Sequence, residues 1–388
     1  MLGEFTYCNP TRLHFGRESL SCLRQELARY GPTVQLIYGG GSIKRNGIYE
    51  QVTKVLRQCG KQVVDDGGIT PNPTIQRVRQ GAELARRVHT DLLLAVGGGS
   101  CCDYAKAVSI SVHCEDDPWE KYYLRMEDVS CPIVPVGCVL TMAGTGSEMN
   151  GGAVITNPQT HQKLGHVFDS RVFPHFAVMN PEFTMTLPRE QIASGCFDIM
   201  SHILEQYLSD WDDTTTDYIA EGLMRSLIHS SQIAVEDPAD YQARSNIMWT
   251  ATWALNTLLS CGKTTDWMAH MLGQTIGGFT NATHGMTLSA ISLAYYRHIM
   301  GACPEKFARM AVNVWQIPRE EKSLPQLAKA GVAAMEQWMR RLGVVMRVSQ
   351  LGITEDILDE IVSQVPIRTG GYRMLDAEEI RQILWESL

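Results

Sequence analysis

The sequence predicts two domains of different class: an amino-terminal α/β domain built on a mostly parallel sheet, and a carboxy-terminal domain made only of helices. Two observations carry this prediction. A unit of buried strand, glycine-rich turn and helix occurs three times in the first 112 residues, and such alternation is typical of a parallel sheet with helices on both faces. After Pro188 the pattern becomes amphipathic and helical, so we place the domains at residues 1–187 and 188–388.

The elements follow from hydrophobic periodicity and from the position of glycine and proline. In the first domain, strands are expected at residues 34–38, 62–65, 91–96, 133–136, 153–156 and 176–179. Helices are expected at residues 18–29, 46–58, 74–88 and 103–112. In the second domain, helices are expected at residues 191–208, 218–235, 241–258, 267–276, 287–299, 327–342 and 353–365.

Composition and charge narrow the class of function. The 388 residues are 44% hydrophobic, which is ample for packed cores. A net charge of -8 without long basic runs argues against nucleic acid or a membrane surface as partner, and favours small-molecule chemistry. The eleven cysteines are odd in number and contain no C-x-x-C pair, so we expect no disulfide framework and a cytoplasmic location. No export signal or membrane-spanning run is expected.

The stretch from Gly195 to Tyr207 carries a first candidate site. Asp198 and His202 lie four residues apart on an expected helix, so both side chains emerge on one face. Alone, such a pair is more often an ordinary surface contact. His270 and His284, the second just past an expected glycine turn at Gly277 and Gly278, would add two imidazoles. One carboxylate and three imidazoles suit zinc or ferrous iron in a catalytic site.

Glycine-rich turns after buried strands form a second candidate site. Gly97–Ser100 and Gly39–Ser42 each follow a strand, and a turn of this kind lets backbone N–H groups approach a phosphate. Neither is a G-x-G-x-x-G fingerprint, and each taken singly is equally consistent with a plain connection. Together with hydroxyls in the stretch 141–148, from Thr141, Thr145 and Ser147, they point to a dinucleotide crevice, although each hydroxyl is equally consistent with a turn or cap.

These motifs resemble the iron-containing, group III metal-dependent alcohol dehydrogenase family, and within it the NADPH-dependent butanol dehydrogenase and aldehyde reductase branch. The resemblance covers nearly the whole chain. Its landmarks are Pro10-Thr11, Phe15-Gly16, Gly39–Ser42, Pro71-Asn72-Pro73, Gly97–Ser100 with Asp103 and Lys106, Thr141–Glu148, Lys163, Leu187-Pro188, Gly195, Asp198, His202 and the region from His270 to Gly285.

The resemblance implies a dinucleotide-binding domain, a helical domain and an active site in the cleft between them. It assigns the metal, Fe2+ or Zn2+, to Asp198, His202, His270 and His284, which would act in catalysis through that metal. The cofactor residues expected from the motifs are Gly40, Gly41, Ser42, Asn72, Gly97, Gly98, Gly99, Ser100, Asp103, Thr141, Thr145, Ser147 and Lys163. A homodimer is also implied.

Two features refine this expectation. Family members that use NAD carry an acidic residue after the first strand, whereas this chain has Gly40-Gly41-Ser42 followed by Lys44, so we predict NADP(H). Many members carry a further histidine four residues after the third ligand, and here that position is Gln274, which does not titrate.

The predicted function is reversible hydride transfer between NADPH and small aldehydes or primary alcohols. Two alternatives remain open at this point. One is a lyase resembling dehydroquinate synthase, which would need a basic pocket, whereas Met268–Phe279 is mostly apolar. The other is a non-catalytic sensor that binds nucleotide and metal.

Overall fold

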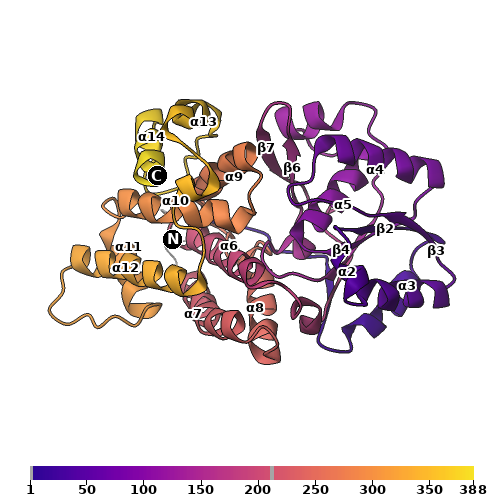
Figure 1. Ribbon diagram of the computed structural model, residues 1–388, viewed down its shortest axis with the longest axis horizontal. Helices are drawn as coiled ribbons and strands as arrows, with labels where there is room; N and C mark the ends of the chain where they lie inside the picture. Colours follow the sequence, from indigo (N-terminus) through magenta and orange to yellow (C-terminus); the bar gives the residue numbers. More distant parts are fainter. Residues whose placement is uncertain (1–2, 210–213) are drawn as a thin grey trace. The chain divides into compact units, whose positions relative to one another are not determined.

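The computed structural model describes residues 3–209 and 214–388. The chain forms two compact units, an α/β unit and a helical unit (Figure 1). The α/β unit contains Cys8–Leu187 and Ala239–Met248, and the helical unit contains the chain before Cys8 together with Pro188–Pro238 and Trp249–Leu388. An α/β part and a helical part were both expected from the sequence, and the structure confirms this fold class.

The α/β unit is organised around a six-stranded sheet in the order β1-β8-β5-β4-β2-β3. Every pairing in this sheet is parallel, as predicted. The four inner strands are buried along their whole length, which explains why they read as mostly apolar runs rather than as alternating patterns. The six strands are β1 Arg12–Phe15, β2 Thr33–Tyr38, β3 Gln62–Asp66, β4 Leu92–Gly97, β5 Val136–Leu140 and β8 Phe176–Met179.

Helices cover both faces of this sheet, with α4 and α5 on one side and α3 on the other (Figure 1). The face with α4 and α5 is sealed by a core that includes Val78, Tyr104 and Cys138, and the opposite face by one that includes Leu27, Val52 and Phe176. The helical segments of this unit are η1 Ser19–Cys22, α1 Leu23–Leu27, α2 Ser42–Arg45, α3 Ile48–Gln58, α4 Ile75–Val88, α5 Gly99–Ser111, η2 Trp119–Leu124, η3 Ser147–Met149 and η4 Pro181–Thr184.

Three strand assignments differ from the sequence-based expectation. The strand expected at residues 133–136 begins only at Val136, because the proline before it has no N–H for the ladder, although the carbonyl of Pro135 accepts from Leu93 N at 2.9 Å. The strand expected at 153–156 is β6 Gly152–Asn157, which pairs antiparallel with β7 Gln162–Val167 in a separate hairpin. The edge strand β1 pairs with β8, 164 positions along the chain, a contact that no local pattern signals.

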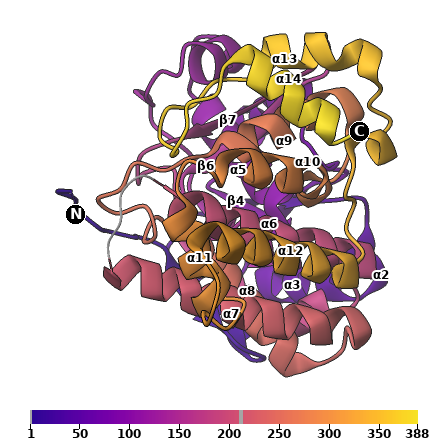
Figure 2. The ribbon, with the colours of Figure 1, turned by 90° about the vertical axis from the view of Figure 1, so that its left-hand side faces the viewer.

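The helical unit is organised around α6 Arg189–Tyr207, which packs against α7, α9 and α10 (Figure 2). From Ile192 onward every residue of α6 is buried, so this is a core helix whose polar residues need partners inside the protein. None of the helices among the described residues combines the length and apolarity that a bilayer crossing requires. The other helical segments after Leu187 are α7 Thr214–Glu236, α8 Tyr241–Ala254, α9 Met268–Thr280, α10 His284–Ile299, α11 Pro304–Asn313, α12 Leu324–Leu342, η5 Val348–Leu351, η6 Glu355–Ile357, α13 Leu358–Gln364 and α14 Ala377–Glu386. Helix α8 belongs to the α/β unit as far as Met248 and to the helical unit from Trp249.

The prediction of a glycine turn before His284 is wrong. Helix α9 continues through Gly277 and Gly278 and ends at Thr280. The chain turns instead at Asn281, whose φ of 54° is left-handed and whose N–H bonds back to the carbonyl of Gly277. Asparagine tolerates this conformation, so it ends the helix where a glycine commonly would.

Candidate metal centre and cofactor loops

The first two candidate metal ligands lie on one face of α6. Asp198 and His202 are one helical turn apart, and Nε2 of His202 lies 3.7 Å from Oδ1 of Asp198. Both side chains are buried, with exposed fractions of about one twentieth. Burying a carboxylate and an imidazole away from water costs free energy unless other polar groups or a cation compensate for the lost hydration.

The other two candidates come from α9 and α10 and converge on the same oxygen atom. Nε2 of His270, on α9, lies 3.9 Å from Oδ1 of Asp198, and Nε2 of His284, the first residue of α10, lies 3.7 Å from it. The ring centroids of His202 and His270 are 4.7 Å apart, and those of His270 and His284 are 5.2 Å apart. The structure therefore brings all four predicted ligands together from three helices.

A close helix contact places His284 at this point. Gly285 follows it, and a Cβ atom on Gly285 would overlap the carbonyl oxygen of Ser194 on α6. Only the absence of a side chain lets the start of α10 approach α6 so closely. His284 is the most accessible of the four, with 21% of its side chain exposed.

The donor set fits a divalent transition metal. Asp198, His202 and His270 each offer one ligand atom, and these atoms lie within 4.8 Å of one another. Burial lowers the pKa of His202 well below its ordinary value, and the nearby His270 lowers it further, so His202 is neutral and has a lone pair to share. Neutral imidazoles with one carboxylate suit Zn2+ and Fe2+ equally, and no cysteine thiolate takes part.

A supporting carboxylate, Glu205, was missed by the sequence reasoning. It follows Asp198 by seven residues on the same face of α6 and is fully buried. Its carboxylate bonds to Nδ1 of His270, to the backbone N–H of His270 at 3.1 Å and to the hydroxyl of Ser201 at 3.0 Å. The spacing of seven was the available signal, because it continues the face that carries Asp198 and His202.

Behind Glu205 lies a second acidic group, Asp266. Its backbone N–H donates to the carbonyl of Glu205 at 3.0 Å, and its carboxylate accepts from the hydroxyl of Tyr295. Burial and the charge of Glu205 raise the pKa of Asp266 above its ordinary value. Tyr295 therefore holds the carboxylate of Asp266, while the backbone of Asp266 is tied to the residue whose carboxylate bonds to His270.

In the α/β unit, the turn after β4 has the backbone that phosphate binding requires. Gly97 ends β4, Gly98 is extended, and Gly99 and Ser100 open α5. The carbonyl of Gly97 accepts from the N–H of Thr141 at 3.0 Å. A Cβ atom on Gly99 would lie 2.5 Å from Cγ2 of Thr145, so the loop and the 141–145 stretch are in close contact. Predicted residues from these two stretches therefore lie together at the carboxyl edge of the sheet.

Asp103 and Ser147 bind each other. The hydroxyl of Ser147 donates to Asp103 Oδ1, and the N–H of Val154 donates to Asp103 Oδ2 at 3.1 Å. The fully buried Lys106 holds the same turn by donating to the carbonyls of Ser147 at 2.9 Å and Asn150 at 3.2 Å. In this structure Asp103 and Ser147 therefore shape the 145–150 turn, and direct contact of either with a cofactor stays a prediction.

The remaining cofactor candidates lie on neighbouring elements. Gly40 and Gly41 lie between β2 and α2, Ser42 is the first residue of α2, and Gly41 has the left-handed φ of 94° that favours glycine. Asn72 precedes α4 and Lys163 lies on β7. These two segments are linked through Thr156, which donates from its backbone to Pro73 at 2.9 Å and pairs with Lys163 across the hairpin.

Comparison with known proteins assigns the chain to a family. The model of the iron-containing alcohol dehydrogenases matches residues 10–181, and that of the carboxy-terminal domain of the Fe-containing alcohol dehydrogenase family matches residues 192–388. The chain belongs to the iron-containing alcohol dehydrogenase family. It is therefore an oxidoreductase of alcohols and aldehydes, and the lyase and sensor alternatives are not favoured.

Relatives in this family match along the whole chain. NADH-dependent butanol dehydrogenase A of Clostridium acetobutylicum is 34% identical, with 99% of each chain covered. NADPH-dependent aldehyde reductase YqhD of Escherichia coli is 35% identical over 91% of this chain and 90% of its own. The crystal structure of NADH-dependent butanol dehydrogenase A from Thermotoga maritima superposes with a TM-score of 0.93 at 32% identity, covering 99% of this chain and 98% of the other.

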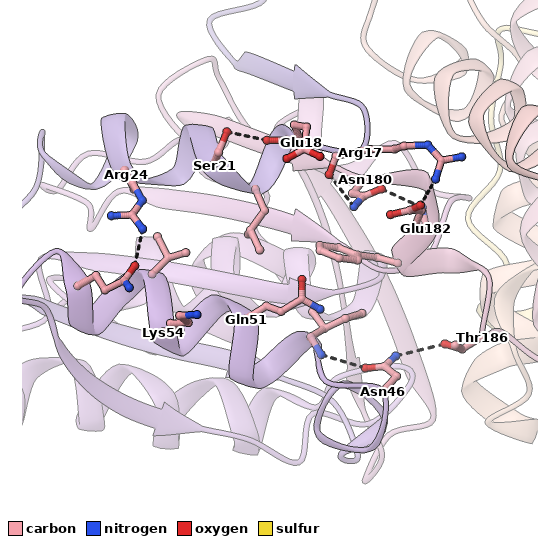
Figure 3. A pocket seen from close by; sticks show the side chains of 15 residues that line it. Arg17, Glu18, Ser21, Arg24, Asn46, Gln51, Lys54, Asn180, Glu182 and Thr186 are labelled. Carbon is pink, nitrogen blue, oxygen red and sulfur yellow. Dashed lines mark hydrogen bonds and ion pairs between the residues drawn. The ribbon is translucent and has the colours of Figure 1, made fainter.

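The α/β unit also has a surface groove (Figure 3). Its volume is about 640 Å³, and η1 and α3 form its walls. Arg17 pairs with Glu182 and Arg24 with Gln58 across it. None of the predicted metal or cofactor residues is among the described residues that line the groove, so we do not assign it to the alcohol dehydrogenase reaction.

Proposed function

We propose that this protein reduces small aldehydes to primary alcohols, and catalyses the reverse oxidation, with NADPH and one Fe2+ or Zn2+ ion. The observation that carries the proposal is the approach of three imidazole Nε2 atoms to one oxygen of Asp198, at 3.7 to 3.9 Å, in a buried site. A divalent ion in such a site polarises a carbonyl group and stabilises negative charge on its oxygen, while the nicotinamide ring carries the hydride.

The chain's own residues hold and orient these groups. Asp198 would supply a negatively charged ligand and the three histidines would supply imidazole lone pairs to a divalent ion, which would favour a carbonyl oxygen. The lower accessibility of Asp198, His202 and His270 limits water around the reacting groups.

The residues that follow β2 support a preference for NADPH. Gly40 has open space around it, Ser42 is exposed, and neither offers a carboxylate that would repel a 2'-phosphate. The two carboxylates that end the neighbouring strand β3 have partners: Asp65 accepts from Tyr49 at 2.9 Å, and Asp66 accepts from Gln35 at 2.7 Å. The relatives include both NADH-dependent and NADPH-dependent proteins, so the proposal rests on these residues.

The route of the proton differs from that in relatives with a second histidine on α9. Gln274 lies one turn beyond His270 and is 8% exposed. Because an amide neither takes up nor releases a proton by titration, we propose that water and the cofactor ribose carry the proton here. A homodimer and a cytoplasmic location complete the proposal.

The experiment that tests the function is consumption of NADPH with butanal by protein stripped with a chelator and then reloaded with Zn2+ or Fe2+. We expect activity to vanish on stripping and to return with one of the two metals. The variant Asp198→Ala, treated in the same way, should neither retain metal nor turn over. Failure of the reloaded wild type to consume NADPH with any small aldehyde would overturn the proposed function, and an active, metal-free Asp198→Ala variant would overturn the role of the metal.

A further inference from the structure

The N-cap residue of α9 supplies no acceptor to the start of the helix; the carboxylate of Asp266, one residue earlier, accepts from the N–H of Met268. That N-cap residue is Trp267, which has a left-handed φ of 62° and whose side chain makes no capping hydrogen bond. The first N–H groups of a helix have no partner inside the helix and need an acceptor from elsewhere. For His270, the third residue of α9, that acceptor is Oε2 of Glu205 on α6, at 3.1 Å.

The same carboxylate also fixes the ring of His270. Oε1 of Glu205 contacts Nδ1 of His270, and because an ionised carboxylate only accepts hydrogen bonds, Nδ1 carries the proton. The lone pair is then on Nε2, the atom that lies 3.9 Å from Asp198 Oδ1. One residue of α6 therefore binds both the backbone and the side chain of a candidate ligand on α9.

We propose that Glu205 is a positioning residue for the metal centre, which holds His270 in the ligating tautomer and sets the distance between the ligands of α6 and the ligand of α9. This inference rests on the proposed function, since it concerns the same metal. Helix α6 supplies two ligands directly, Asp198 and His202, and presents the third through Glu205. The carboxylate at the start of α9 is also favourable for the helix dipole.

The substitutions Glu205→Gln and Glu205→Asp distinguish the effect of the carboxylate's charge from the effect of the side chain's length. Glutamine has the same length but only one acceptor oxygen, so it can serve the backbone N–H or the ring N–H, and its NH2 group faces the other donor. Where the NH2 faces Nδ1, the ring proton moves to Nε2 and His270 no longer binds metal. Aspartate keeps both acceptor oxygens but is one methylene shorter, so it restores part of the function.

The experiment measures the affinity of the full-length protein for Zn2+ by competition with a chromophoric chelator, and the visible absorption spectrum after loading with Co2+. We expect Glu205→Gln to raise the dissociation constant for Zn2+ by about 10- to 100-fold. Its Co2+ spectrum should change as a ligand is lost, and Glu205→Asp should lie between Glu205→Gln and the wild type.

Two control variants distinguish positioning from general stability. Ser201→Ala removes the third contact of Glu205 but leaves both contacts with His270, so it should bind metal like the wild type. Glu221 is another buried carboxylate of the helical unit, bonded to Tyr207 at 2.8 Å and Asn313 at 3.0 Å, and is not one of the four candidate ligands. Glu221→Gln should lower the melting temperature without changing metal affinity or the Co2+ spectrum.

The outcomes separate the two proposals. If the wild type binds Zn2+ and Co2+ and folded Glu205→Gln binds them within about threefold of it with the same spectrum, the positioning role is wrong and the proposed function stands. Should Glu205→Gln not fold, the same comparison is made with Glu205→Asp, for which wild-type affinity and spectrum overturn the inference. If the wild type itself binds neither metal, the proposed function fails first.

Discussion

Replacing Gly99 with alanine is expected to disturb the turn between β4 and α5 and to weaken nucleotide binding. The added Cβ atom would lie 2.5 Å from Cγ2 and 2.9 Å from Cβ of Thr145. Carbon atoms in contact are ordinarily about 3.5–4.0 Å apart, so Thr145 or the turn must move by about 1 Å. Both partners of this clash belong to the predicted cofactor site, and a shift of either displaces N–H groups that would face the pyrophosphate.

The expected magnitudes follow from this overlap. Overpacking of a tight site costs about 1–3 kcal/mol, which lowers the melting temperature of a unit of this size by roughly 3–9 °C. Loss of one hydrogen bond from a backbone N–H to a charged phosphate costs about 1.5 kcal/mol or more, so the dissociation constant for NADPH should rise at least about tenfold.

The assay pairs nucleotide titration, followed by fluorescence, with thermal unfolding of the same samples. Gly222→Ala in α7 is the control, because a Cβ atom there meets nothing within 4 Å and alanine favours a helix interior. It should raise the melting temperature slightly and leave NADPH binding unchanged. Wild-type affinity and melting temperature in Gly99→Ala would show that the close contact with Thr145 has no role in shaping the cofactor loop.

Three further predictions concern cofactor choice, proton transfer and acid stability. Ser42→Asp should lower the ratio of kcat/KM for NADPH over NADH by about tenfold or more, since a carboxylate repels the 2'-phosphate, and an unchanged ratio in steady-state kinetics would contradict the NADPH assignment. Gln274→His should introduce a titrating step in the profile of kcat between about pH 5 and 8, whereas Gln274→Asn should not, and matching profiles would remove position 274 from the relay. The Arg12 guanidinium lowers the pKa of Glu26 from 4.5 to about 2. Because the folded-state pKa is depressed, this stabilisation is present above about pH 4.5 and is lost as the pH falls towards 2. Glu26→Gln should therefore lower the unfolding free energy by about 1–2 kcal/mol at pH 7, discounted because Arg12 is 39% exposed, and equal slopes of melting temperature against pH in both proteins would refute this.

Much of the α/β unit was predictable because its signals are local. Buried parallel strands such as β2 and β4 read as short apolar runs, and each is followed by glycines that end the strand. The order of strands was not predictable in this way. Pairing of β1 with β8 and the separate β6–β7 hairpin depend on contacts between distant segments, which no window of sequence contains.

The candidate metal ligands were identified from residue type, from the spacing of Asp198 and His202, and from the family resemblance of the His270 and His284 region. Residue type and helical spacing are chemical facts of the chain, and they name candidate donors that the family resemblance then supports. Glu205 was not found, because its spacing from Asp198 gives only its face on α6, whereas its role depends on α9 bringing both the N–H and the imidazole of His270 to the same carboxylate. The approach of α10 through Gly285 was equally invisible. Local sequence dictates which atoms can donate or accept, whereas the distances between donors on different helices come from packing over the whole unit, and packing is not a local property.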